Sequence, residues 1–178
     1  MKKTILILLL FVVSGCSNVM NTPTKEVEEF LGKYQTMNDN VITQLEGVLD
    51  TDNTMNKEQK SEYKELMKKQ YQNLSYKIKD EKIDGEHASI TTEIEVYDYN
   101  KAIQESDEYL DTNSEEFSSA DGTTDEEKFM DYKISKMKDT KDKITYTITF
   151  TLTKEDDEWT LDDITDIDRQ KIHGIYDN

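Results

Sequence analysis

The chain holds one cysteine, Cys16, and two histidines, His87 and His173, so few side chains are suited to nucleophilic or proton-transfer chemistry. A thiol can act as a nucleophile or as an attachment point, and an imidazole can transfer protons near neutral pH. Catalysis by such groups needs a nucleophile, a base and an orienting group within reach of one another. The surroundings of each residue in the sequence therefore decide which chemistry is open to it.

Cys16 ends a segment with three parts. Lys2 and Lys3 supply positive charge, residues 5–13 are uninterruptedly apolar, and residues 14–15 are the small pair Ser-Gly. This order is typical of an export signal. A helix needs about 20 apolar residues to span a bilayer, so the run is too short for a lasting anchor. We therefore expect residues 1–15 to be removed.

The sequence Val13-Ser14-Gly15-Cys16 resembles the lipobox of bacterial lipoproteins. The resemblance implies that a diacylglyceryl group is attached to the Cys16 thiol and that cleavage between Gly15 and Cys16 leaves the lipidated cysteine as the first residue. Two acyl chains anchor a protein stably, whereas one holds it only marginally. The expected location is the outer face of the bacterial cytoplasmic membrane. The alternative is a plain signal peptide whose cysteine is incidental.

The composition favours one acidic domain. Removal of residues 1–15 leaves 163 of the 178 residues, a usual size for a single domain, and takes the net charge from −17 to −19. Such a surface repels nucleic acid and bare anionic membrane. With Cys16 alkylated, no thiol remains for a disulfide, a metal or catalysis. No cofactor is expected.

The two histidines are expected at the surface or the sheet edge. His87 alternates with Ser89 and Thr91 on the polar side of an expected strand, and His173 stands at the end of a short expected helix. No set of nucleophile, base and orienting group can be assembled around either histidine by spacing. The sequence therefore predicts no catalytic residue.

A calcium loop is the other candidate chemistry. The stretch from Asp50 begins like an EF-hand loop, with Asp52 in its third position, but Met55 stands where the loop needs glycine and Ser61 where it needs glutamate. Weak divalent sites could also form in two acidic groups, Asp121 with Asp125, and Asp162, Asp163, Asp166 and Asp168. A solvated acidic surface that keeps a tethered domain soluble is the favoured interpretation, so no metal site is predicted.

Helical periodicity fills the first part of the chain. Thr22-Pro23 is suited to cap a helix whose apolar face holds Val27, Phe30, Leu31 and Tyr34. A second helix carries Val41, Ile42, Leu45, Val48 and Leu49 on its apolar face. A third is expected to start after Asn56, with Tyr63, Leu66, Met67 and Tyr71 on one side.

Period-two alternation begins near residue 73. Residues 74–78 and 88–96, joined by Asp84-Gly85, predict one hairpin, and 144–152 with 159–161 predict a second. Between them, residues 99–111 are helical, and Thr124 with Glu127 predicts a capping box that opens another helix. A short closing helix is expected over Asp166–His173, ended by Gly174.

These elements predict an α+β fold in three segments. The segments are the signal peptide, 1–15; the lipidated cysteine and a short tether, 16–24; and a single acidic α+β domain, 25–178. The domain is expected to pack N-terminal helices on a bent antiparallel sheet of about four strands, with a helical insertion between two hairpins.

The stretches "TPTKEVEEFLGKY" and "EDDEWTLDDI", together with the lipobox, resemble small Gram-positive lipoproteins of unknown function with a nuclear-transport-factor-2-like, or cystatin-like, domain. The resemblance implies a cone-shaped fold. Some members of that fold are isomerases or hydrolases with a carboxylate or histidine in the mouth of the cone. Four aromatic residues on the expected strands are either core or the lining of such a pocket: Tyr76, Tyr146, Phe150 and Trp159.

The sequence favours a non-enzymatic, membrane-anchored binding or protein-interaction module outside the cytoplasm. The strong anchor signal and the lack of a catalytic set are the grounds for it. Its expected partners are membrane lipid, through Cys16, and an envelope protein or cell-wall component. The alternative is a small-ligand binder, or an isomerase- or hydrolase-like enzyme, that uses the interior of the cone.

Overall fold

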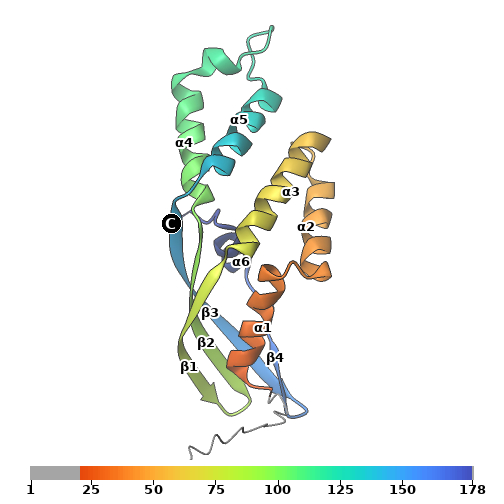
Figure 1. Cartoon of the computed structure of the whole chain (residues 1–178), viewed down its shortest axis with the longest axis vertical. Helices are drawn as coiled ribbons and strands as arrows, with labels where there is room; N and C mark the ends of the chain where they lie inside the picture. The colour runs from red at the N-terminus through yellow and green to blue at the C-terminus, as the bar shows by residue number, and fades with distance from the viewer. Residues whose placement is uncertain (1–20, 178) are drawn as a thin grey trace, which may run out of the picture.

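A computed structural model describes residues 21–177 of the chain (Figure 1). Within this range lie six α-helices and one four-stranded sheet. The helices are α1 (Pro23–Gln35), α2 (Asp39–Thr51), α3 (Lys57–Gln72), α4 (Tyr99–Thr112), α5 (Glu126–Asp139) and α6 (Asp166–His173). The strands are β1 (Ser75–Asp84), β2 (His87–Tyr97), β3 (Lys143–Glu155) and β4 (Glu158–Leu161). The predicted α+β class is confirmed.

The sheet is an antiparallel meander in the order β1-β2-β3-β4. Strands β2 and β3 pair over their whole common length, from His87 opposite Thr153 to Tyr97 opposite Lys143. The turn between β3 and β4 places Asp156 and Asp157 at positive φ. Both predicted hairpins are therefore present in the predicted order.

One face of the sheet is buried and the other faces solvent. The even positions of β3, such as Ile148 and Phe150, are buried, and the threonines between them are exposed. Helix α1 covers the buried face, and its Phe30 ring meets Phe150 edge-on at 5.7 Å. Thr92 also lies on the buried face, where its hydroxyl has no hydrogen-bond partner among the described residues. Side chains from α1 thus fill the space over the sheet.

Helices α4 and α5 form the predicted insertion between β2 and β3. They lie side by side and project beyond the end of the sheet (Figure 1). The backbone N–H of Asp98 donates to the Asp142 carbonyl at 3.0 Å, which closes the base of the insertion. Helix α5 is capped by Asp125, whose side chain accepts from the Lys128 N–H. The predicted capping box with Thr124 is therefore wrong by one residue, because aspartate is the equally effective cap next in line.

The chain enters the domain at the sheet end of the molecule. The Asn21 amide donates to the Trp159 carbonyl at 3.1 Å, and Asn21 Oδ1 accepts from the Trp159 N–H. Thr22 caps α1, and Pro23 is its first residue. The folded domain therefore includes residues 21–24, which the sequence assigned to the tether. This end of the molecule lies opposite the α4–α5 connection (Figure 1).

Gln70 ties three elements together. Its Oε1 accepts from the Tyr97 N–H at 2.8 Å, and its Nε2 donates to the carbonyls of Tyr97 at 2.9 Å and His173 at 2.8 Å. The side chain is fully buried. It joins α3 to the end of β2 and to the end of α6, and so fixes the position of α6 in the fold.

Candidate functional site

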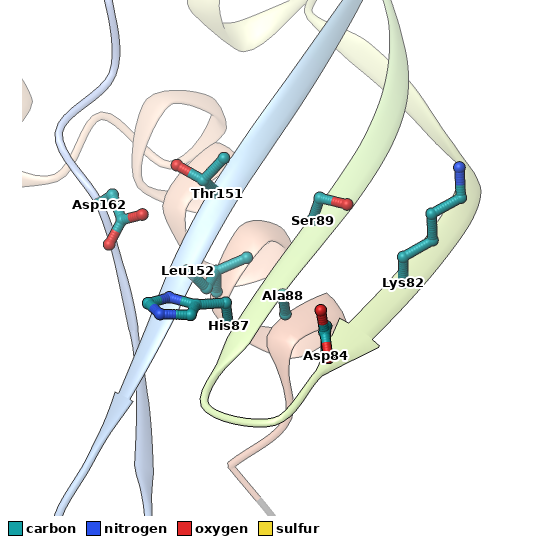
Figure 2. A pocket seen from close by; sticks show the side chains of 8 residues that line it. All are labelled: Lys82, Asp84, His87, Ala88, Ser89, Thr151, Leu152 and Asp162. Carbon is teal, nitrogen blue, oxygen red and sulfur yellow. The ribbon is translucent and has the colours of Figure 1, made fainter.

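An open hollow of about 420 Å³ lies over the polar face of the sheet, near the β1–β2 turn. It contains His87 and Ser89 from β2, with Asp84 and Asp162 nearby (Figure 2). These residue types together could suggest a hydrolytic set. In the described part of the chain, however, no hydrogen bond joins His87 to Ser89 or to either aspartate, and Asp162 instead accepts from the Thr153 hydroxyl at 3.0 Å. His87 is exposed as predicted, and the hollow offers a surface rather than an assembled site.

A second, more enclosed pocket of about 210 Å³ lies among α1, α2, α3 and α6. Its wall is mostly apolar, with a few polar side chains. The lining residues are Tyr34, Val41, Gln44, Leu45, Val48, Leu49, Tyr63, Met67, Tyr71, Arg169, His173 and Ile175. An apolar pocket with a few convergent polar groups is the usual form of a small-molecule site, so this pocket is the candidate functional site.

Three aromatic rings build the inner side of the pocket. The Tyr34 and Tyr71 rings meet edge-on at 5.0 Å, and the Tyr71 ring lies 5.7 Å from the His173 imidazole. Both tyrosines are almost fully buried. Within residues 21–177, neither tyrosine hydroxyl makes a hydrogen bond. Burial raises the pKa of both phenols, so both hydroxyls are protonated and able to donate.

Arg169 supplies the positive charge of the pocket. It is the only arginine in the chain, and it is half-buried on α6. Its positive charge helps to lower the pKa of His173, and at Tyr34 it partly opposes the rise in pKa that burial causes. Its one side-chain hydrogen bond in the described range is long, from Nη2 to the Ile164 carbonyl at 3.5 Å. Most of its five N–H donors therefore remain open to solvent or to a ligand.

His173 is where the sequence prediction was wrong. It was expected at the surface, but the structure packs its ring against Tyr71 in the wall of the pocket. Burial and, to a smaller extent, the charge of Arg169 together lower the pKa of the imidazole to about 4. His173 is half-buried at the end of α6, and a helix of eight residues gives too little periodicity to show which of its sides faces the protein. His173 is accordingly neutral at physiological pH.

We expect the His173 imidazole to titrate near pH 4 in the folded protein. The variant H87Q leaves His173 as the one histidine, so an NMR pH titration of its imidazole signals should have a midpoint near pH 4. A midpoint near pH 6.5 would contradict the burial of the His173 ring. Because the unfolded chain takes up this proton below about pH 6.5, the free energy of unfolding should fall as pH drops from 6.5 to 4. Relative to H173Q, the additional loss should approach about 3 kcal/mol.

The acidic residues considered as cation ligands form no larger cluster with one another. No cluster of three or more candidate metal ligands occurs among residues 21–177. Asp52 instead accepts from the Thr54 hydroxyl at 2.9 Å and from the backbone N–H groups of Thr54 and Met55, and these hydrogen bonds lower its pKa. Asp121 makes the same kind of turn with Thr123. Both aspartates thus shape loops.

The aromatic residues of the strands belong mainly to the core. Tyr146, Phe150 and Trp159 are buried, and Tyr76 is half-buried at the β1 edge. None of the four lines the pocket among the helices. The pocket is therefore separate from the inner face of the sheet, where the resemblance would put it.

Cys16 and Gly15, the predicted lipid-attachment and cleavage residues, lie outside the described residues. Within the described range, no helix has both the length and the apolar character that a bilayer crossing requires. Comparison with protein families, curated proteins and solved structures gives no match.

Proposed function

We propose that the chain is a lipid-anchored lipoprotein on the outer face of the bacterial cytoplasmic membrane, and that its acidic domain is a non-enzymatic binding module. The observation that carries this proposal is the position of Asn21. It lies at the sheet end of the molecule, opposite the projecting α4–α5 insertion (Figure 1). An anchor at Cys16 is five residues away, a reach of at most about 17 Å.

This arrangement keeps the sheet end near the membrane and turns the helical half outward. The strong acidic charge of the chain keeps the domain from lying on anionic lipid. The outward half is then free to meet an envelope protein or a cell-wall component. A non-enzymatic role is also supported by the hollow at His87, where no described hydrogen bond links a nucleophile to a base.

We also propose that the domain is a variant of the cystatin-like cone. A long antiparallel meander with α1 packed across one face supports this. Two features would distinguish the variant: helices inserted between β2 and β3, and an inner face filled by side chains such as Phe30 and Phe150. A filled inner face speaks against an enzyme in the cone interior.

The proposal is tested in cells by comparing the wild type with C16A and with N18A, which keeps the thiol. The wild type and N18A should fractionate with membranes and crosslink to a specific envelope partner at near-equal amount. C16A should leave the membrane fraction. Membrane retention of C16A would disprove the anchor, and turnover abolished by one side-chain change would disprove the non-enzymatic role.

A further inference from the structure

The pocket among α1, α2, α3 and α6 has a size and a wall suited to a small apolar body. Its volume is about 210 Å³, and its sides include Leu45, Leu49 and Met67. An apolar cavity of about 150 Å³ is large enough to hold benzene. A single ring with a short side chain, or a short branched acyl chain, therefore matches the space.

The positive charge of Arg169 favours a negatively charged ligand in the pocket. All ion pairs in the described part of the chain join a lysine to a carboxylate, and none involves Arg169. This is unexpected in a chain with 39 acidic residues. The neighbouring Asp168 is held by Lys171 at 3.6 Å and by the Thr165 hydroxyl at 2.7 Å. Arg169, the one arginine of the chain, thus lines the pocket without an ion pair to any described carboxylate.

Two tyrosine hydroxyls add hydrogen-bond donors to the pocket that Arg169 lines. The hydroxyls of Tyr34 and Tyr71 are protonated donors without described partners, and both residues line the pocket. His173 is neutral and adds no second charge. A planar guanidinium matches a carboxylate through two parallel N–H···O bonds, and nearby hydroxyls can satisfy its remaining lone pairs.

We propose that this pocket binds a small free carboxylic acid with an apolar body, with its carboxylate on Arg169 and its body against α2 and α3. The carboxylate of the ligand accepts hydrogen bonds from the Arg169 guanidinium and neutralises its charge. The ring or chain of the ligand fills the space between Leu45 and Met67. The inference goes beyond the proposed tethered role, because it holds whether or not Cys16 carries lipid.

The test is equilibrium dialysis of labelled 3-phenylpropionate against the full chain in phosphatidylcholine nanodiscs, with empty nanodiscs as the blank. The wild type should bind one equivalent saturably. R169Q should weaken binding by about ten- to a hundredfold, since a hydrogen bond to a charged group is lost. K77Q removes one positive charge at an exposed position of β1, outside the pocket, and should stay within about twofold of the wild type.

A variant that blocks the pocket and two alternative ligands test where and how 3-phenylpropionate binds. V48W places a large ring at the pocket mouth, at a residue that is 67% exposed and so tolerant of change, and should also weaken binding. Equal binding of 3-phenylpropanol would overturn the carboxylate role, and equal losses in R169Q and K77Q would overturn the role of Arg169. Binding of a peptide ending in phenylalanine but not of 3-phenylpropionate would reassign the pocket to peptide C-termini. No binding of either would overturn the proposal, while membrane fractionation of Cys16 variants reports separately on the anchor.

Discussion

Replacement of Gly174 by alanine should lower the free energy of unfolding by about 3 kcal/mol or more, because two costs act at one position. Gly174 ends α6 in the left-handed region at φ 71°, where a side chain is strained. A Cβ there would also lie 2.1 Å from the Tyr97 carbonyl oxygen and 2.2 Å from Gln70 Nε2. Backbone cannot move aside without breaking the hydrogen bonds that hold α6.

Urea unfolding of G174A and G85A separates these two costs. Gly85 has a similar φ of 61°, but its Cβ would meet no heavy atom within 4 Å. G85A therefore reports the strain alone, about 1–2 kcal/mol. A loss in G174A no larger than in G85A would show that the end of α6 can shift away from Tyr97 and that the contact around Gly174 is loose.

The fold could be predicted wherever the chain repeats a pattern over several residues. Strand β3 is the clearest case, because every second residue from Ile144 to Leu152 is apolar and the others are threonine. A slip of one residue would bury the threonines, so only one register is consistent with one buried face. The helices α1 to α3 were predictable for the same reason, and the caps expected at Thr22 and Asn56 both accept from the first turns of their helices.

Single polar residues in the core were not predictable in this way. Thr92 interrupts the apolar side of β2 between Ile90 and Ile94 and is fully buried. Gln70 is fully buried as well, although in the sequence it follows two lysines in "MKKQYQ" and is itself polar. Their burial depends on what packs against them from distant segments, and local spacing carries no information about those segments.

The pocket could not be found from the sequence for the same reason. Its walls come from α1, α2 and α3, but its charge comes from Arg169 and its inner edge from His173, more than 90 residues further along the chain. The one available signal was compositional: a single arginine among 21 lysines. Arginine offers a fork of donors that lysine lacks, which makes its exceptional use informative once its position is known.

The position of α6 links the stability of the domain to the pocket. Helix α6 has only eight residues and could not be stable alone. It is held by the Gln70 hydrogen bond to the His173 carbonyl and by the bond from the Asn100 N–H to the Gly174 carbonyl at 2.8 Å. Arg169 and His173 both lie on α6. A change that breaks the contacts holding this helix therefore also removes Arg169 and His173 from the wall of the pocket.

The change Q70L should therefore cost about 3–5 kcal/mol of unfolding free energy, since it leaves the Tyr97 N–H and the carbonyls of Tyr97 and His173 without their partner in a buried site. The matched control is Q72L, two residues on at an exposed position of α3, which should change stability by less than about 0.5 kcal/mol. Hydrogen exchange gives the local readout: amides of Arg169 to His173 should exchange faster in Q70L than global unfolding explains. Unchanged exchange in α6 would mean that the helix is held by its apolar contact through the fully buried Ile172, and not by Gln70.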